Sequence, residues 1–341
     1  MGTDPEAGPA NRVAVIGAGS WGTALAMVAA RNQLEVRLWA REPEVSREIN
    51  RTRRNPFYLS DFELPANIRA TTAVEDAVEG ADFALLVVPS HAMREMITSL
   101  RRHLRSETVL VSAAKGVENS TLMRMEEVVA DVLRDSFEPQ YVALSGPSFA
   151  LEVAKGDPTA IVAASLHRGS SEMIQHSLSS GSFRVYTNTD VVGVELGGAV
   201  KNVVAIAAGV VRGLGFGTNA VAAIITRGLA EMTRLALARG ARAETLAGLA
   251  GLGDLVLTCT GELSRNRHVG IELGRGRRLA EILGEMREVA EGVKTTSSIY
   301  ELGRRLGIEM PITESIHALL YEDKPANEAA NQLMGRPLKR E

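Results

Sequence analysis

Two lysines and one aspartate stand in surroundings that suit proton transfer. Lys201 lies among small and apolar residues at 197–202, where loss of hydration would lower its pKa and let it exchange a proton near neutral pH. Snorkelling of this side chain to the surface is an alternative that the sequence leaves open. Lys115 follows an apolar, strand-like run, and Asp254 lies in an apolar, glycine-rich turn. This carboxylate either orients a lysine or caps a helix that begins at Leu255.

Two further segments offer groups that bind phosphate. Residues 264–267 bring together a hydroxyl, two guanidiniums and an amide, from Ser264, Arg265, Asn266 and Arg267. This set suits charge-assisted hydrogen bonds to a phosphate. A second segment carries Gly146 and Ser148 with exposed backbone N–H groups at the end of another apolar run. Helix capping or a surface turn would explain the same residues without a ligand.

A glycine-rich turn near the N-terminus predicts a dinucleotide site. Gly17, Gly19 and Gly22 have the spacing GxGxxG between a β-branched run at 13–16 and a helix-like run at 23–30. The first glycine permits a tight turn, the second lets the backbone approach a pyrophosphate, and the third lets the helix pack on the sheet. The N–H groups and dipole of that helix would face the anion. A nicotinamide or flavin enzyme is therefore the leading interpretation.

The preference between NAD and NADP depends on one arginine. Sites that prefer NAD place Asp or Glu about 20 residues beyond the glycines, whereas here Arg41 follows the second strand-like run. Its planar guanidinium would pair with a 2′-phosphate, which favours NADP. Glu42 adjoins it and weakens this preference, and a solvated loop charge is the alternative.

The elements that position these groups divide the chain into two halves. The first half alternates helical stretches with apolar β-rich runs at 13–16, 35–39, 83–88, 109–111, 141–144, 160–163 and 183–186. Its early runs are apolar throughout, as in parallel strands covered on both faces. Long helical patterns follow, with Asp190 as N-cap of the first. We predict an α/β protein with a doubly wound, Rossmann-like, mostly parallel sheet over 11–189 and an all-helical substrate-binding and catalytic domain over 190–341.

Composition restricts the partners and the compartment. A net charge of −3 over 341 residues gives no reason to expect nucleic acid. No apolar run reaches the roughly 20 residues of a membrane span, so we expect no stable membrane insertion. The polar start of the chain and the single cysteine, Cys259, favour the cytoplasm. No metal site is predicted, and the apolar content of the helical half is compatible with a homodimer or simply with a buried core.

The chain resembles the NAD(P)-dependent glycerol-3-phosphate dehydrogenases of the bacterial type. The resemblance extends from about Arg12 to Arg340. Its most specific segments are 17–26 (GAGSWGTALA), 145–150 (SGPSFA), 193–202 (GVELGGAVKN), 225–231 (ITRGLAE), 251–261 (GLGDLVLTCTG) and 264–267 (SRNR). Thr218 and Val221 depart from the family pattern, and Val221 leaves one positive charge missing near a helix start. None of the assigned site residues is lost.

The resemblance implies the reduction of dihydroxyacetone phosphate to sn-glycerol 3-phosphate, a phospholipid precursor, with NADPH or NADH. It implies Lys201 as the proton donor or acceptor, with Lys115 and Asp254 completing the catalytic set. The implied substrate contacts are Lys115, Gly146, Ser148, Lys201, Asp254, Ser264, Arg265 and Asn266. The implied cofactor contacts, beside the three glycines, are Ser20, Trp21, Arg41, Lys115, Ala150, Arg265, Val289 and Glu291. Burial lowers the pKa of a lysine and a nearby carboxylate raises it, so the direction of the Lys201 shift stays open.

Two other functions remain as alternatives. One is a two-domain dehydrogenase of the β-hydroxyacid or 6-phosphogluconate type that acts on a carboxylate substrate, and residues 264–266 argue against it. The other is a dinucleotide-sensing protein without catalysis. The presence of Lys201, Asp254 and Arg265 argues against that function.

Overall fold

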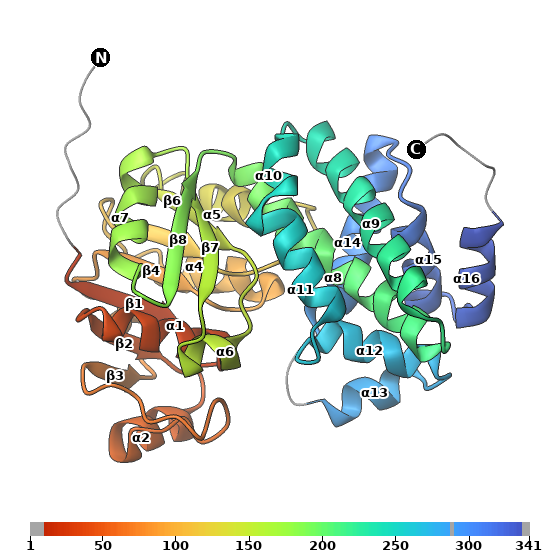
Figure 1. Ribbon diagram of the computed structural model, residues 1–341. Coiled ribbons are helices and arrows are strands. Elements are labelled where there is room, and N and C mark those ends of the chain that lie inside the picture. The colour runs from red at the N-terminus through yellow and green to blue at the C-terminus, as the bar shows by residue number, and fades with distance from the viewer. Residues whose placement is uncertain (1–9, 287–289, 336–341) are drawn as a thin grey trace. The chain divides into compact units, whose positions relative to one another are not determined.

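The computed structural model describes residues 10–286 and 290–335, which divide into two compact units (Figure 1). The first unit comprises residues 10–114 and Met125–Val194, and the second comprises Lys115–Arg124 and the described residues from Glu195 onward. A short segment of the second unit thus interrupts the first unit in sequence. The division of the chain into 11–189 and 190–341 stays a prediction.

The first unit is built on one eight-stranded sheet with the order β3-β2-β1-β4-β5-β6-β7-β8. The strands are β1 (Arg12–Ile16), β2 (Glu35–Trp39), β3 (Ile68–Thr71), β4 (Phe83–Leu86), β5 (Val109–Ser112), β6 (Tyr141–Ser145), β7 (Thr159–Ala164) and β8 (Phe183–Asn188). Neighbouring strands pair in parallel, except β6 with β7. The predicted doubly wound, mostly parallel sheet is confirmed. The sequence pattern missed β3, which is four residues long and buries alternate side chains.

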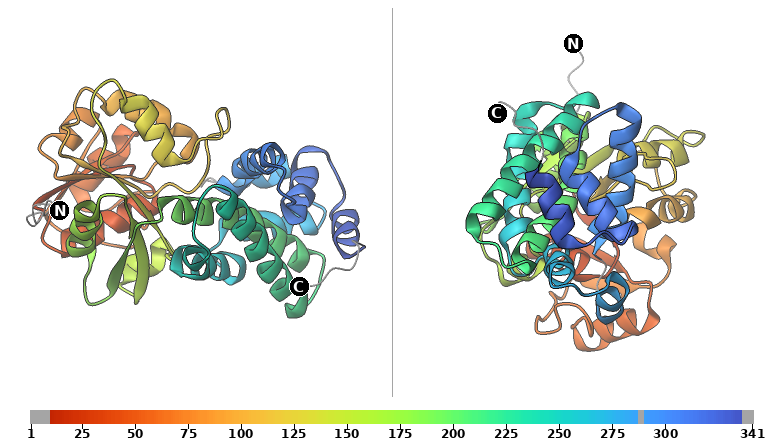
Figure 2. Two further views of the ribbon diagram at one scale, coloured as in Figure 1. Left: turned by 90° about the horizontal axis from the view of Figure 1, so that it is seen from above. Right: turned by 90° about the vertical axis from the view of Figure 1, so that its right-hand side faces the viewer.

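Helices cover both faces of this sheet, as the view from above in Figure 2 shows. The helices are α1 (Ser20–Arg31), α2 (Pro43–Thr52), α3 (Val74–Val78), η1 (Ser90–Ala92), α4 (Met93–Leu100), α5 (Met125–Leu133), α6 (Ala150–Lys155) and α7 (Arg168–Leu178). Helix α1 contacts α6 and α7, whereas α4 contacts α3 and α5. In β1, Val13 and Val15 join the core cluster that includes α1, and Ala14 and Ile16 point the other way. All four are fully buried, which explains the unbroken apolar run.

The second unit is helical from Glu195 onward. Its elements are α8 (Val191–Gly213), α9 (Thr218–Ala238), α10 (Ala243–Ala247), η2 (Leu249–Gly253), α11 (Asp254–Thr260), α12 (Arg265–Gly274), α13 (Leu279–Glu285), α14 (Glu291–Leu306), α15 (Pro311–Tyr321) and α16 (Ala326–Met334). The predicted N-cap of α8 is confirmed, because Asp190 Oδ1 accepts a hydrogen bond from Gly193 N at 2.8 Å. Helix α8 is long and apolar enough to cross a membrane, but 94% of its apolar window is buried inside the structure. It is the core helix of this unit.

Helix α8 packs directly against the backbone of α12. A Cβ atom on Gly209 of α8 would lie 2.1 Å from the carbonyl oxygen of Arg267, and one on Gly270 of α12 would lie 2.0 Å from that of Ile206. Only glycine permits so close a crossing. The crossing holds the start of α12, and with it Arg265, at a set distance from α8.

Glu231 of α9 accepts hydrogen bonds from the N–H groups in the first turn of α15. Its Oε1 accepts a hydrogen bond from Ile312 N at 2.6 Å, and its Oε2 accepts from Thr313 N and Thr313 Oγ1, both at 3.2 Å. Helix N-termini leave such N–H groups without partners inside the helix. Burial raises the pKa of Glu231 to about 7, although these donors act to lower it. The side chain therefore links α9 to α15 and titrates near neutrality.

We expect Glu231→Ala to lower the free energy of unfolding by roughly 1–3 kcal/mol, because two buried N–H groups lose their acceptor. The raised pKa adds a pH dependence. The folded protein holds this proton more tightly than the unfolded chain, so unfolding free energy falls as pH rises from about 4.5 to about 7. The size of this fall is up to roughly 3 kcal/mol.

Urea denaturation of the wild-type protein and of Glu231→Gln at several pH values measures this component. The glutamine variant keeps one acceptor but cannot titrate, so its unfolding free energy should not decrease over this pH range. An identical pH dependence in the two proteins would contradict the assignment.

Candidate active site

The second unit brings Lys115, Lys201 and Asp254 together around one carboxylate. Asp254 Oδ1 accepts a hydrogen bond from Lys201 Nζ at 2.5 Å, and Oδ2 accepts one from Lys115 Nζ at 2.6 Å. The side chains of Lys201 and Asp254 are 7% and 1% exposed, and that of Lys115 is 16% exposed. Lys201 therefore does not snorkel to the surface. Two cations share one anion in a site that is largely shielded from water.

The glycine-rich turn before α11 brings Asp254 to Lys201. A Cβ atom on Gly197, four residues before Lys201 on α8, would lie 2.8 Å from the carbonyl oxygen of Ala250. That oxygen belongs to η2, a single π-helical turn. In this turn Gly253 N donates at 3.1 Å to the carbonyl oxygen of Gly248, five residues earlier, which is one residue further than in an α-helix. Helix α11 then begins at Asp254 itself, with its carboxylate directed at the two lysines.

Thr258 adds a contact that the sequence analysis did not assign. Its Oγ1 donates a hydrogen bond to the carbonyl oxygen of Asp254 at 2.6 Å and accepts one from Lys201 Nζ at 2.9 Å. Because the hydroxyl proton is used on the carbonyl, a lone pair faces the ammonium. The signal in the sequence was the spacing, since positions four apart share one face of a helix.

The electrostatics of the cluster decide the question that the sequence left open. Burial, helped by the charge of Lys115, outweighs the attraction of Asp254, and together these effects lower the pKa of Lys201 to about 7. Burial acts to raise the pKa of Asp254, but the two ammonium groups hold it below its ordinary value. Asp254 is thus an anion, and Lys201 has both protonation states within reach at neutral pH.

In the first unit, the glycine-rich turn has the shape of an anion cradle. Gly17 has a φ of +122°, and a Cβ there would lie 2.4 Å from the carbonyl oxygen of Val87. A Cβ on Gly22 would lie 1.8 Å from the carbonyl oxygen of Gly17, so the protein's own backbone requires both glycines. A Cβ on Gly19 would meet no atom within 4 Å. This open space before α1 is where a bound pyrophosphate would lie, and the residues present fit a dinucleotide.

Asn55 forms hydrogen bonds to this turn, and no pattern in the sequence indicated this role. Its Nδ2 donates hydrogen bonds to the carbonyl oxygen of Ala18 at 2.9 Å and to Thr23 Oγ1 at 3.0 Å. The side chain is fully buried. Asn55 thereby fixes the turn between β1 and α1.

Comparison with known proteins matches both parts of the chain to one family. Models of the N-terminus and the C-terminus of NAD-dependent glycerol-3-phosphate dehydrogenase match residues 12–170 and 190–331. The chain belongs to this family. The resemblance described above and the predicted NAD(P)-dependent oxidoreductase are confirmed, and a small phosphorylated triose as substrate follows from the family.

Individual relatives cover nearly the whole chain. The chain is 56% identical over 330 residues to glycerol-3-phosphate dehydrogenase [NAD(P)+] of Geobacter sulfurreducens, covering 97% of this chain and 98% of the relative. It is 55% identical over 329 residues to that of Koribacter versatilis, covering 96% and 98%. The crystal structure of glycerol-3-phosphate dehydrogenase from Coxiella burnetii superposes with a TM-score of 0.91 at 41% identity, covering 96% of this chain and 99% of that one. NAD(P) as cofactor is therefore confirmed, and the preference for NADP stays a prediction.

In this dehydrogenase, two residues of the predicted phosphate cradle are hydrogen-bonded within the fold. Ser264 Oγ caps α12 by accepting a hydrogen bond at 3.2 Å from a backbone N–H of its first turn. Asn266 is buried, donates to Asn202 Oδ1 and accepts from Gly292 N, each at 3.0 Å. These bonds join α8, α12 and α14. Arg265, the first residue of α12, is exposed. Substrate contacts by all three stay predictions.

The turn after β6 holds the other predicted substrate residues. Gly146 has a φ of +145°, and a Cβ there would lie 2.9 Å from Ile161 Cα in the neighbouring strand. Ser148 Oγ donates to the carbonyl oxygen of Gly146 at 3.0 Å. Ala150 begins α6 and packs partly buried against the core of the first unit.

The remaining cofactor residues belong to several elements. Ser20 and Trp21 open α1, and Glu291 opens α14, while Val289 lies outside the described residues. Arg41 is 82% exposed, and its Nη2 lies 2.7 Å from Glu42 Oε1. The guanidinium that would favour NADP thus pairs with the neighbouring carboxylate.

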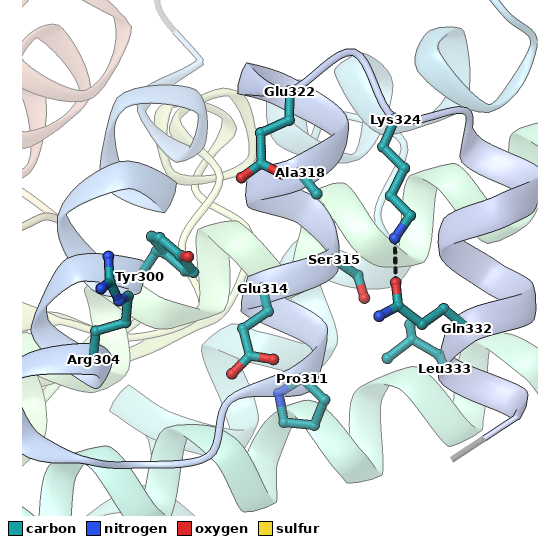
Figure 3. Close-up of a pocket in the computed structure, with 10 residues that line it drawn as sticks. All are labelled: Tyr300, Arg304, Pro311, Glu314, Ser315, Ala318, Glu322, Lys324, Gln332 and Leu333. Carbon is teal, nitrogen blue, oxygen red and sulfur yellow. Dashed lines mark hydrogen bonds between the residues drawn. The ribbon is translucent and has the colours of Figure 1, made fainter.

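A separate hollow of about 400 Å³ lies among α14, α15 and α16 (Figure 3). Its lining residues are Tyr300, Arg304, Pro311, Glu314, Ser315, Ala318, Glu322, Lys324, Gln332 and Leu333. Lys324 Nζ donates to Gln332 Oε1 across one side of it. None of these ten residues belongs to the predicted substrate or cofactor sets. In the described parts of the chain, no group of three or more His, Cys, Asp and Glu side chains has the arrangement of a metal site.

Proposed function

We propose that Lys201 is the proton donor when this enzyme reduces dihydroxyacetone phosphate to sn-glycerol 3-phosphate. The observation that carries the proposal is the buried contact of Lys201 Nζ with Asp254 Oδ1 and Thr258 Oγ1. This contact aims a lysine whose pKa is about 7, and the best general acids titrate near the working pH.

The chemistry of the step follows from the charges of the cluster. A reduced nicotinamide, when bound, would supply the hydride for the carbonyl carbon of the substrate. As negative charge grows on the carbonyl oxygen, Lys201 neutralises it and transfers a proton from Nζ to that oxygen. The lysine is left as a neutral amine and regains a proton from solvent. In the reverse direction the neutral amine takes the proton of the substrate hydroxyl.

The other residues of the cluster hold Lys201 in a state that can perform this transfer. Asp254 supplies the counter-charge that lets an ammonium persist in a buried site. Lys115 places a second positive charge on the same carboxylate, which keeps Lys201 acidic enough to release its proton. Thr258 accepts one N–H of Lys201 and so restricts the direction of the others.

We further propose the sites at which the substrate phosphate and the cofactor bind. Arg265, held at the start of α12 by the bonds of Ser264 and Asn266, would grip the phosphate through its guanidinium. Gly146, Ser148 and Lys115 would complete the substrate contacts. The turn at 17–22 with Ser20 and Trp21 would hold the pyrophosphate, and the implied cofactor contacts Arg41, Ala150, Arg265, Val289 and Glu291 remain proposals.

The reaction is tested by mixing the purified protein with dihydroxyacetone phosphate and NADPH or NADH and following the loss of reduced-cofactor absorbance. Oxidation that depends on the added triose phosphate supports the proposal. Demonstrable cofactor binding without turnover would favour the dinucleotide-sensing alternative. Formation of reduced cofactor from NADP+ or NAD+ with 3-hydroxy acids, and no turnover with the triose phosphate, would favour the alternative dehydrogenase.

Arg41 provides a test of cofactor preference. We expect Arg41→Ala to raise KM for NADPH by roughly 10-fold or more, because one charge-assisted hydrogen bond is lost. KM for NADH should stay nearly unchanged. Glu42→Gln is the matched variant, because it removes the carboxylate that now accepts from Arg41 and should lower KM for NADPH. Equal effects of Arg41→Ala on both cofactors would contradict a role in binding the 2′-phosphate.

The compartment and the assembly are inferred from the sequence alone. We infer that the enzyme works in the cytoplasm, since a chain with a single cysteine, Cys259, cannot form an intrachain disulfide and suits a reducing compartment. The expected homodimer rests on the apolar content of the helical half. Light scattering of the purified protein measures its mass and decides between one chain and two.

A further inference from the structure

Lys115 lies at one end of a closed loop that ends at Arg124. The loop belongs to the second unit, although residues of the first unit precede and follow it. Its two sides meet, because Val117 and Arg124 form an antiparallel bridge and Glu118 N donates to the carbonyl oxygen of Met123 at 2.9 Å. A movement of Arg124 would therefore be transmitted to the side of the loop that carries Lys115.

Arg124 is anchored to α8 by a buried ion pair. Its Nη1 lies 2.7 Å from Glu195 Oε2, and the two side chains are 9% and 5% exposed. Burying two opposite charges adds little net stability, because the cost of desolvation offsets their attraction. The best-attested use of such pairs is to select one arrangement of the chain. The arrangement selected here is the position of the loop on α8.

Helix α8 thus carries both Lys201 and the residue that anchors the loop of Lys115. Glu195 lies six residues before Lys201 on the same rigid helix. We propose that Arg124 and Glu195 are positioning residues, which hold the loop on α8 so that Lys115 Nζ meets Asp254 Oδ2. This inference rests on the roles proposed above for Lys115 and Lys201. Neither Arg124 nor Glu195 is proposed to touch the substrate.

Loosening this anchor has a defined electrostatic consequence. The charged groups that face Lys201 are Asp254 on α11 and Lys115 on the loop, and the buried thiol of Cys259 lies near them. The ammonium of Lys115 lowers the pKa of Lys201. When Lys115 moves away, Lys201 therefore keeps its proton to a higher pH. The oxidation of glycerol 3-phosphate, which needs the neutral amine, then requires a higher pH as well.

The test compares Arg124→Met, Lys115→Met and the double variant in the full-length enzyme. Each protein is assayed for kcat and KM of both substrates over a range of pH, and for NADPH affinity by fluorescence titration. We expect Arg124→Met to reduce kcat by about 10-fold. A positioned proton-transfer group contributes about 10²-fold or more, and displacing Lys115 should remove part of that contribution. Its pH profile for oxidation should shift upward, in the same direction as that of Lys115→Met, while NADPH affinity is unchanged.

The double variant separates positioning from a general loss of structure. If Arg124 acts through Lys115, adding Arg124→Met to Lys115→Met should change kcat by no more than about twofold. Multiplicative losses, or an unshifted pH profile in Arg124→Met, would overturn the inference. Arg124→Lys should recover part of the loss, because it restores the positive charge beside Glu195.

Two further controls keep the result interpretable. If Arg124→Met does not fold, Glu195→Gln replaces it in the same cycle, since it removes the charge of the pair with little change in shape. If Lys115→Met alone keeps wild-type kcat and pH profile, the proposed role of Lys115 fails. That outcome is distinct from failure of the anchor, in which Lys115→Met is impaired and Arg124→Met is not.

Discussion

Replacing Lys201 with alanine should lower turnover with dihydroxyacetone phosphate by a factor of about 10²–10⁴, the typical contribution of a positioned general acid. The substitution removes the ammonium that contacts Asp254 and Thr258. The carboxylate of Asp254 keeps its ion pair with Lys115, so the surrounding fold should be retained. Because the glycine-rich turn belongs to the first unit, NADPH should bind with near wild-type affinity. Steady-state kinetics and fluorescence titration measure the two quantities separately.

Lys201→Arg is the matched variant for this result. Arginine keeps the positive charge but does not release a proton near neutral pH. If the main role of Lys201 is proton transfer, the arginine variant should be impaired nearly as severely as the alanine variant. If it only neutralises the growing charge, arginine should restore much of the rate. Wild-type turnover in Lys201→Ala would remove this lysine from the mechanism.

Asp254→Asn should have the second largest effect, on both stability and rate. It leaves the ammonium groups of Lys115 and Lys201 facing each other in a buried site without their shared carboxylate. Removing one partner of a buried ion pair costs about 3–5 kcal/mol. Urea denaturation should detect this loss, and it should be smaller at alkaline pH, where a buried lysine can lose its proton.

The pH profile distinguishes an electrostatic role of Asp254 from a merely structural one. In the wild-type enzyme the pKa of Lys201 is about 7, so reduction, which needs the ammonium, should decline as pH rises through about 7. Oxidation of glycerol 3-phosphate, which needs the amine, should rise over the same range. Asp254 raises this pKa, so Asp254→Asn should move both limbs to lower pH. Limbs that stay in place would show that Asp254 does not control the protonation of Lys201.

The amino-acid sequence by itself determined the architecture and the enzyme class. The β-branched runs and the glycine spacing at 17–22 are local patterns, because strand, turn and helix preferences depend on neighbouring residues. The family segments, such as 193–202 and 251–261, are also local patterns, and they indicated the activity. Strand β3 was missed because four residues with alternate burial give a weak signal.

Only the tertiary structure decided which charges meet and how each is shielded. Lys115 and Asp254 are 139 positions apart, and nothing local shows that their side chains touch. From the sequence alone, burial and the counter-charge shift the pKa of Lys201 in opposite directions, and neither can be given the larger weight. In the enclosed site burial has the larger effect, so the pKa of Lys201 is lowered. The pairing of Arg124 with Glu195 was also invisible, since both residues look like ordinary surface charges in sequence. Electrostatic energies depend on distance and on exposure to water, and both are properties of the assembled fold.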